Sequence, residues 1–382
     1  MKKICEGNCL GCGVCVDVCQ KNAIQFVIDE NGFYLPKIDQ SLCVECSACS
    51  NVCIVNNPVD SNKSLKVYYG NSTDKEMLLR TTSGGIVGEL YQIYLKAGYS
   101  VCGVVYDEDW HCQFMMTKNE TDVLKFHGSK YVGADTTGIY KAVKNELKEG
   151  RGVFFVGTPC QCAGLKNFLG KGYEKLVICD FICFGVASQT TLNKYLSEIA
   201  QGDRVVEYMM RGKKKGYVES YSNIKLKSGR MLSDVNFYRT DFGYLFASKL
   251  ILKKECFDCP FACQERVGDI TVGDWKDHIS EYQKQYGCSL VLCNTKKGQL
   301  IIDQLISHHK IELEIMDHQI AVEKCWRLSK KMEIPRYRDA CLDLIKNKTI
   351  HDLSCLYQKK SKRFRISHAF FKIGNIFMKR KS

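Results

Sequence analysis

Residues 9–19 read CLGCGVCVDVC and residues 43–53 read CVECSACSNVC, so one cysteine spacing, C-x-x-C-x-x-C-x-x-x-C, occurs twice near the start of the chain. Thiolates at every third position of a tight loop can hold three corners of a 4Fe-4S cubane, and the fourth cysteine reaches across to the other cluster. The spacing therefore predicts two 4Fe-4S clusters. By this crossed rule one cluster is held by Cys9, Cys12, Cys15 and Cys53, and the other by Cys43, Cys46, Cys49 and Cys19.

Zinc sites and disulfides are the alternatives for these cysteines. Zinc knuckles use two separated pairs of ligands, whereas this chain has two quartets, so the spacing favours clusters. The two loops resemble those of the two-cluster bacterial ferredoxins. Gln20 and Ile54 stand where those proteins usually have proline, and this difference removes no ligand. Cys5 has no place in the repeat and is interpreted as a spare thiol.

Composition and charge limit the classes of protein. The chain has 382 residues, 45% of them hydrophobic, which is enough to bury the cores of two or three domains. The short polar start and the lack of an uncharged apolar run of roughly 18 residues predict neither a signal peptide nor a membrane span. Cluster-type cysteine spacing predicts a reducing compartment, hence the cytoplasm. The net charge of +13 comes mainly from residues 359–381, with nine basic residues and no acid, and no nucleic-acid reader motif occurs.

The pattern of apolar residues predicts an α+β protein. Residues 23–28 and 33–38 form the expected hairpin between the two cysteine loops, so residues 1–55 are expected to be a bacterial-type ferredoxin domain. Residues 56–66 are polar and rich in breakers, as in a linker. From residue 67 onward, strands and helices alternate and later strands pair as hairpins, which predicts a mixed α/β domain over residues 67–356.

The stretch GVFFVGTPCQCAGL, residues 152–165, contains the most clearly marked helix start. An apolar strand ends at Gly157, Thr158 is a good N-cap, and Gln161 completes a capping box three residues later. Cys160 then lies in the first helical turn, where the helix dipole favours a thiolate, a cluster or a phosphate. The alternative for Cys160 is a buried thiol in an ordinary turn, and Cys162 is interpreted in that way.

The stretch ECFDCPFACQERVGDITVGDW, residues 255–275, contains a third group of cysteines. Cys256, Cys259 and Cys263 give C-x-x-C-x-x-x-C, which is one ligand short of a 4Fe-4S site. A fourth thiolate has to come from elsewhere, and Cys160 and Cys183 both follow predicted strands. The remaining cysteines are interpreted as core or surface thiols.

From residue 67 to residue 346 the chain resembles the coenzyme F-420 hydrogenase/dehydrogenase beta-subunit family, whose relatives include 7-hydroxymethyl chlorophyll a reductase. Several separate motifs carry the resemblance: Thr82-Ser83-Gly84-Gly85, Gly128-Ser129-Lys130-Tyr131-Val132, Gly157-Thr158-Pro159-Cys160-Gln161, Asp180 to Cys183 with Gly185-Val186, Cys256-x-x-Cys259, and Gly268-Asp269-Ile270 through Gly273-Asp274-x-Trp275. Many members carry an N-terminal two-cluster ferredoxin segment, as this chain does.

The resemblance implies an FAD-binding iron-sulfur protein with a further 4Fe-4S cluster beside the flavin. The matching cysteines are Cys160, Cys183, Cys256 and Cys259, with Cys263 in reserve. FAD is expected against Ser83, Gly84, Gly85, Gly128, Ser129, Lys130, Tyr131 and Thr158, and the resemblance makes Tyr131 and Asp274 the expected proton donors. Relatives commonly have histidine and proline where this chain has Phe184 and Ala187, so a proton donor is not expected there.

Two classes of function follow. The first is a reductase in which a ferredoxin or other low-potential donor passes electrons through the clusters to FAD, which reduces a small organic substrate. The second is an electron-relay beta subunit of a larger hydrogenase or dehydrogenase complex. A nucleic-acid-binding cluster protein is a distant third. The residues do not identify the substrate, and nothing in them reads coenzyme F-420 specifically.

Two basic stretches allow more than one interpretation. Residues 211–215, RGKKK, are either a solvated loop or a contact for an acidic substrate or a flavin phosphate. Residues 357–382 interleave aromatic, aliphatic and basic residues, which predicts a helix lying on an anionic membrane surface. A solvated C-terminus is the alternative.

Overall fold

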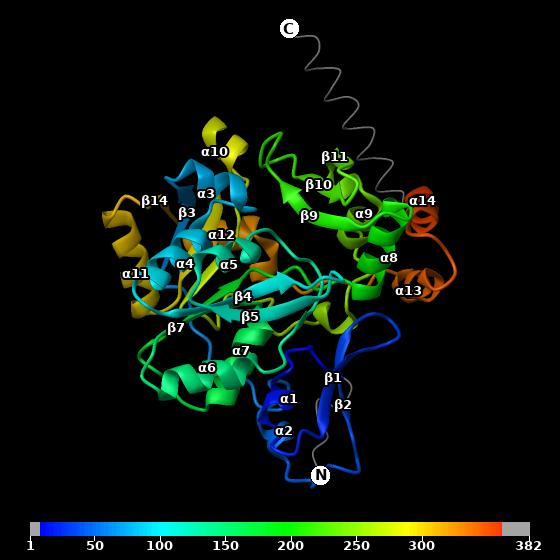
Figure 1. Ribbon diagram of the computed structural model, residues 1–382. Coiled ribbons are helices and arrows are strands. Elements are labelled where there is room, and N and C mark those ends of the chain that lie inside the picture. The colour runs from blue at the N-terminus through cyan, green and yellow to red at the C-terminus, as the bar shows by residue number, and fades with distance from the viewer. Residues whose placement is uncertain (1–7, 361–382) are drawn as a thin grey trace.

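The computed structural model describes residues 8–360, and its largest feature is a nine-stranded sheet (Figure 1). The strand order is β14-β3-β13-β12-β8-β7-β4-β5-β6. Strands β12, β8, β7 and β4 are parallel neighbours, whereas β14, β3, β13 and β12 pair antiparallel and β5 returns antiparallel beside β4. The strands are β3 (Lys66–Ser72), β4 (Ser100–Tyr106), β5 (Cys112–Thr117), β6 (Ala134–Asp135), β7 (Val153–Gly157), β8 (Leu176–Phe181), β12 (Ile270–Asp274), β13 (Ser289–Cys293) and β14 (Ile311–Met316).

Helices cover both faces of this sheet, which explains why its central strands are continuous apolar runs. Successive residues of a strand point to opposite faces, and Phe154 and Phe155 of β7 accordingly enter two different cores. Helices α4 (Ile86–Lys96) and α11 (Lys296–Ser307) pack over the Phe154 face. Helices α6 (Ile139–Lys148) and α7 (Pro159–Leu169) pack over the Phe155 face. The predicted mixed α/β architecture is confirmed.

A second, antiparallel sheet of three strands, in the order β11-β10-β9, packs with the C-terminal helices around a separate core. Its strands are β9 (Val205–Gly212), β10 (Tyr221–Leu226) and β11 (Met231–Asn236), and the hairpin of β10 and β11 was predicted. The helices of this region are α8 (Gln189–Ala200), η3 (Phe237–Arg239), α9 (Asp241–Ala247), α13 (Arg338–Ile345) and α14 (Ile350–Lys360). The remaining short helices are α3 (Lys75–Arg80), α5 (Glu120–Val123), η2 (Leu124–Phe126), η4 (Lys254–Cys256), α10 (Glu281–Tyr286), α12 (His318–Lys324) and η5 (Trp326–Leu328).

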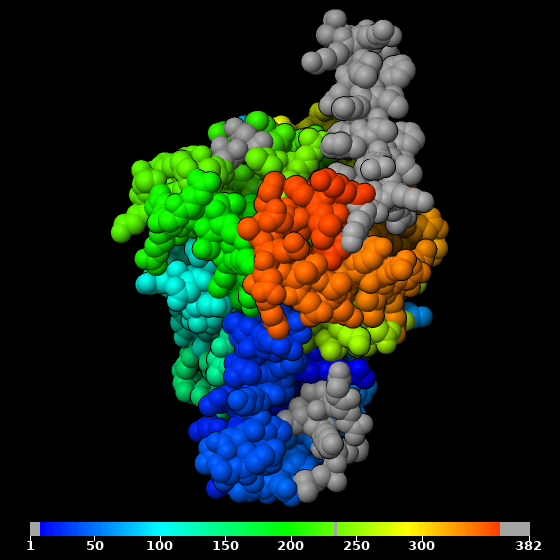
Figure 2. Space-filling model, turned by 90° about the vertical axis from the view of Figure 1, so that its right-hand side faces the viewer, coloured from blue at the N-terminus to red at the C-terminus, as the bar shows by residue number. Residues whose placement is uncertain are grey.

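The N-terminal cysteine loops flank the predicted hairpin. Strands β1 (Ile24–Ile28) and β2 (Tyr34–Ile38) pair antiparallel, and the short helices α1 (Val14–Val18) and α2 (Ala48–Asn51) follow the two loops. The turn of the hairpin lies beneath the C-terminal helices (Figure 2), where Glu30 pairs with Lys346 at 2.9 Å and the Gln189 amide donates to the Gly32 carbonyl at 2.8 Å. The N-terminal segment is therefore packed against the rest of the chain.

Asp17 of α1 attaches this segment most firmly. Helix α6 begins after Gly138, which offers no side chain as a cap, and Asp17 supplies the missing carboxylate from more than a hundred residues away. Its oxygens accept from the amides of Gly138 at 2.6 Å, Tyr140 at 2.9 Å and Lys141 at 3.3 Å. Asp17 thus acts as the N-cap of a helix in another part of the chain.

Replacing Asp17 with alanine is expected to lower the free energy of unfolding by about 1–2 kcal/mol, because the first amides of α6 lose their acceptor. It is also expected to speed proteolysis within residues 56–66, since the N-terminal segment loses an attachment. Asp17→Asn keeps an acceptor oxygen and should cost less. Denaturant titration and limited proteolysis of the two variants measure this, and equal stability of all three proteins would contradict the capping role.

The predicted linker, residues 56–66, is held by backbone hydrogen bonds. Asn62 and Arg266 exchange two of them, at 2.9 and 2.8 Å, and the Leu65 amide donates to the Cys293 carbonyl at 2.7 Å. The domain boundaries themselves remain predictions. Cys5 and residues 361–382 of the predicted tail lie outside the described residues. Within residues 8–360, no helix is long and apolar enough to cross a membrane.

Candidate functional site

Four cysteines from three distant parts of the chain come together beside the carboxyl ends of β7 and β8. Cys160 lies in the first turn of α7, Cys183 follows β8, and Cys256 and Cys259 lie in and after η4. Burial raises the pKa of Cys160, and the neighbouring thiols of Cys183 and Cys259 raise it further. Burial likewise raises the pKa of Cys183 to about 11 and that of Cys256 to about 12. These four partly buried cysteines are therefore neighbours.

Local structure fixes the positions of two of these cysteines, Cys160 and Cys256. The Thr158 amide donates to Gln161 Oε1 at 2.9 Å, so the predicted capping box is formed and fixes the turn that carries Cys160. Gly185, at φ +136°, passes so close to Cys256 that an added Cβ would lie 3.2 Å from the Cys256 Cβ. Only glycine allows this approach and this backbone conformation.

Cys263, the reserve ligand, is engaged differently. Its thiol lies 3.3 Å from the Glu265 carbonyl, to which it donates. Cys162 is fully buried and lies 3.9 Å from the Cys179 carbonyl, in line with its interpretation as a core thiol. Residues 8–360 contain no group of three or more His, Cys, Asp or Glu side chains arranged to hold a single metal ion.

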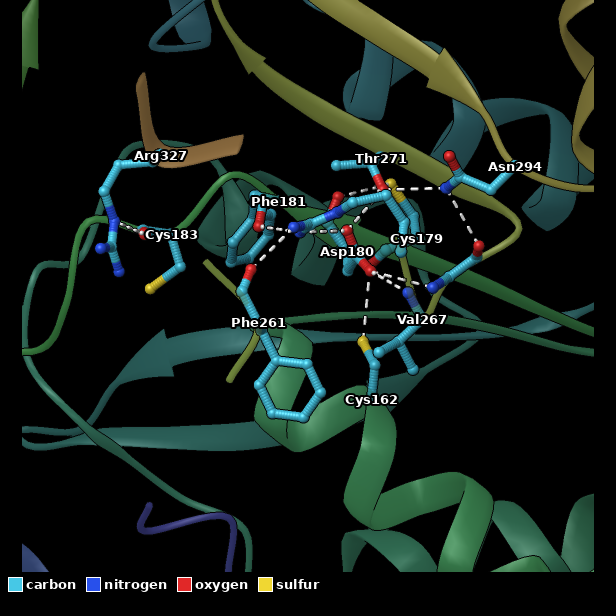
Figure 3. Close-up of polar contacts among 12 residues, drawn as sticks. Cys162, Cys179, Asp180, Phe181, Cys183, Phe261, Val267, Thr271, Asn294 and Arg327 are labelled. Atoms are coloured by element: carbon cyan, nitrogen blue, oxygen red, sulfur yellow. Dashed lines mark hydrogen bonds and ion pairs between the residues drawn. The ribbon is translucent and has the colours of Figure 1, made fainter. Parts of the chain in front are cut away.

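A buried ion pair between Asp180 and Arg266 lies at the end of the strand that leads to Cys183 (Figure 3). Arg266 Nη2 lies 3.0 Å from Asp180 Oδ1, and the two residues are 1% and 0% exposed. The other oxygen of Asp180 accepts from the amides of Val267 and Gly268, at 3.2 and 2.9 Å. Arg266 Nη1 donates to the Phe261 carbonyl at 3.0 Å. The pair therefore joins the strand that leads to Cys183 to the loop that carries Cys259 and Cys263.

The N-terminal thiols lie in two groups. Burial raises the pKa of Cys12, and the thiols of Cys15, Cys9 and Cys53 raise it further, so these four are neighbours. Burial also raises the pKa of Cys49, with added contributions from Cys46 and Cys43, and Cys19 packs in the same hydrophobic cluster as Cys49. Cys15 belongs to the same hydrophobic cluster, and Cys49 contributes to its raised pKa, so the two groups adjoin each other. The crossed ligand sets remain a prediction.

The Cys12 loop faces the first turn of α7. The Tyr140 hydroxyl donates to the Cys12 carbonyl at 2.6 Å and lies 3.3 Å from the Gln161 carbonyl, next to Cys160. The charge of Cys12 also contributes to the raised pKa of Cys160, after the larger effect of burial. Cys46, in the other N-terminal group, is exposed to solvent. We call Cys160, Cys183, Cys256 and Cys259 the Cys160 set. One N-terminal group therefore faces the Cys160 set, and the other faces outward.

Both expected proton donors, Tyr131 and Asp274, contact the same residue, Arg211. Arg211 Nη1 donates to the Tyr131 hydroxyl at 2.8 Å and lies 2.6 Å from Asp274 Oδ2. The Arg211 side chain is 5% exposed, and its Nη2 has no hydrogen-bond partner among the described residues. A buried donor without a partner is uncommon in proteins and suggests that a ligand supplies the acceptor.

The loops expected to hold FAD lie beside this group. The Ser129 amide donates to Thr82 Oγ1 at 2.9 Å, which joins the Ser83-Gly84-Gly85 loop to the Gly128–Tyr131 loop. Lys213 is buried, and its ammonium donates to the carbonyls of Leu78, Ser83 and Tyr286. Burial lowers the pKa of Lys213 to about 7.

Lys130 makes contacts that the motif did not suggest. Its ammonium donates to four carbonyls of residues 125–128 at 3.1–3.4 Å, so it closes its own loop. Burial lowers the pKa of Lys130 to about 8. The Lys130 side chain is thus already engaged within the protein, whereas Arg211 Nη2 has no partner among the described residues.

The aromatic side chains connect the two regions. Tyr131 stacks on Phe246 at 4.6 Å between ring centroids, and Phe246 contacts Phe184 at 5.3 Å. Phe184 comes directly after Cys183, and the Ala187 amide donates to the Tyr131 carbonyl at 2.7 Å. The cysteine set and the Tyr131–Arg211–Asp274 group are therefore neighbours through one short segment of chain.

Comparison with known proteins fits this arrangement. Residues 67–139 and 150–319 match the family models for the N-terminal and C-terminal parts of the coenzyme F-420 hydrogenase/dehydrogenase beta subunit. The chain belongs to this family. Residues 8–57 match the 4Fe-4S dicluster domain, so the chain is an iron-sulfur protein of an oxidoreductase family.

The relatives differ in how much of their length this chain covers. A coenzyme F-420-dependent sulfite reductase of Methanocaldococcus jannaschii is 25% identical over 341 residues, which are 86% of this chain and 50% of that protein. The chain therefore spans about half the length of this relative. An uncharacterised ferredoxin of the same organism is 42% identical over 49 residues, 13% of this chain and 62% of its own length. A chain of the F-420-reducing NiFe hydrogenase complex of Methanosarcina barkeri superimposes with a TM-score of 0.46 and 19% identity, covering 72% of this chain and 97% of that one.

Proposed function

We propose that the chain is an iron-sulfur flavoprotein that collects single electrons and delivers them in pairs. Electrons from a ferredoxin or a similar low-potential donor enter the N-terminal clusters and pass to a third 4Fe-4S cluster held by Cys160, Cys183, Cys256 and Cys259. FAD, bound beside Tyr131 and Arg211, supplies the conversion from one-electron to two-electron chemistry. The observation that carries the proposal is the Cys160 set, which lies between the Cys12 loop and the Tyr131–Arg211–Asp274 group.

The exposure of the thiols suggests an order of transfer. Cys46 is exposed, so the cluster of Cys19, Cys43, Cys46 and Cys49 is the one that an external donor reaches first. Cys12 is 7% exposed, and its loop is hydrogen-bonded through Tyr140 to the turn of Cys160. The cluster of Cys9, Cys12, Cys15 and Cys53 then passes electrons to the third cluster.

At the flavin, the protein contributes binding and control of protons. The unpartnered Nη2 of Arg211 fits an anionic or carbonyl oxygen of the cofactor. The Tyr131 hydroxyl and the Asp274 carboxylate, both held by Arg211, are the groups that can hold or move a proton there. Asp274 is about one-third exposed, so this group can exchange protons with solvent.

Replacing Arg211 with glutamine is expected to weaken FAD binding by about 10- to 100-fold, because a buried charged donor to the ligand is worth roughly 1.5–3 kcal/mol. Quenching of flavin fluorescence during reconstitution of the apoprotein measures the affinity. Arg338→Gln is the matched control, since Arg338 is another buried arginine, lies 2.5 Å from Asp339 and is not among the residues expected to contact FAD. Unchanged affinity in Arg211→Gln would remove Arg211 from the flavin site.

The alternative is that the chain is an electron-relay subunit of a larger complex. We consider it because the chain covers only 50% of the length of the sulfite reductase. A reductase turns over a small organic substrate as an isolated chain with reduced ferredoxin. A relay subunit takes up electrons from ferredoxin but passes them on only when a partner is added. Comparing turnover of the isolated chain with that of the chain plus its partner separates the two. Coenzyme F-420 is the first substrate to test, because the relatives' descriptions name it.

A further inference from the structure

Arg327 is a buried cation whose charge the described protein does not balance. It belongs to η5, beyond the residues that the family models match, and it is 6% exposed. Its Nε donates to the Cys183 carbonyl at 3.2 Å (Figure 3). Its Nη1 donates to the Lys330 carbonyl at 3.2 Å. Within residues 8–360, no carboxylate lies at ion-pair distance from it.

The other buried cations near the cysteine set differ from Arg327 in this respect. Arg266 pairs with Asp180 at 3.0 Å, and Lys253 pairs with Glu255 at 3.5 Å. A guanidinium without a counter-charge is expensive to bury, and buried charges are therefore normally paired. The Trp326 ring, 5.4 Å from the Arg327 guanidinium carbon, carries no net charge, so an anion bound next to Cys183 would complete the pairing.

A cubane held by four thiolates supplies that charge. Such a cluster is negative in both redox states and becomes more negative when it accepts an electron, so a fixed cation nearby favours the reduced state. A guanidinium is a permanent positive charge in proteins.

We propose that Arg327 is the charge partner of the third cluster and raises its reduction potential relative to the two N-terminal clusters. This inference rests on the proposed function. One electron then moves from an N-terminal cluster to the third cluster with no bond made or broken, and Arg327 makes this step favourable.

The test is a potentiometric titration of the anaerobically purified full chain, followed by EPR. Arg327→Gln removes the charge, and the reduction potential of the third cluster is expected to shift downward while those of the N-terminal clusters stay in place. Arg327→Lys keeps the charge and should keep most of the potential. The control is Arg338→Gln, another buried arginine, whose guanidinium is paired with Asp339 at 2.5 Å and donates to the Leu252 carbonyl. No potential should shift in that variant.

Iron analysis separates the outcomes. If Arg327→Gln loses about four irons and Arg327→Lys keeps them, the charge is needed even to hold the cluster, which supports the inference. If Arg327→Gln keeps its iron and its potential, or if both Arg327 variants lose iron alike, the inference is overturned. If the unaltered chain already lacks a third cluster signal, the proposed function fails, and this inference fails with it.

Discussion

Replacing Cys256 with serine is expected to remove about four iron atoms per chain and to leave those of the N-terminal clusters, because the loss of one thiolate opens one cubane. Cys259→Ser should give the same result. Both residues are partly buried neighbours of Cys183, far in sequence from the N-terminal loops. Iron analysis and EPR of the reduced variants provide the measurement.

Two further cysteines make this experiment selective. Cys325 is partly buried near the site but is not in the predicted set, so Cys325→Ser should keep all iron. Cys263, whose thiol donates to the Glu265 carbonyl, should also be replaceable. Loss of iron in Cys263→Ser together with full iron in Cys259→Ser would mean that the ligand assignment is wrong.

Replacing Asp180 with alanine is expected to lower the free energy of unfolding by about 3–5 kcal/mol, because Arg266 is left buried without its partner. The amides of Val267 and Gly268 lose their acceptor as well. Denaturant titration followed by circular dichroism measures the loss. The cysteine loop tied to Arg266 should also become disordered, so iron at the third site is expected to fall.

Two variants control for this effect. The double variant Asp180→Ala with Arg266→Met removes both charges and should recover part of the stability, because no unpaired charge is then buried. Glu76→Ala breaks an exposed pair with Arg80 and should cost less than about 1 kcal/mol. If Asp180→Ala is no more damaging than Glu76→Ala, the ion pair does not support the site.

Local patterns in the sequence were sufficient for much of the fold. The capping box at Thr158 marked the start of α7, and apolar runs marked the central strands, because both signals depend on residues a few positions apart. The hairpin of β1 and β2 was equally readable from its alternation and turn. These local features also placed Cys160 correctly in the first turn of a helix.

The residues that complete the site depend on contacts between distant segments. Arg211 looked like part of a basic loop, yet it lies in β9 and contacts Tyr131 and Asp274, 80 and 63 positions away in sequence. A signal existed in the mostly apolar run of residues 205–210, which extends the strand up to the basic run. Arg327 carried no such signal, because its role depends on burial without a carboxylate, which only the three-dimensional structure reveals.

The central claim is that electrons reach the flavin through the third cluster, and stopped-flow reduction of the reconstituted full chain by reduced ferredoxin tests it most directly. The intact chain, with about twelve irons, is expected to show bleaching of the flavin absorbance after rapid reduction of the N-terminal clusters. Cys256→Ser, with flavin still bound, is expected to show the cluster phase but no flavin bleaching on the same timescale. Flavin reduction at the same rate in both proteins would contradict the account.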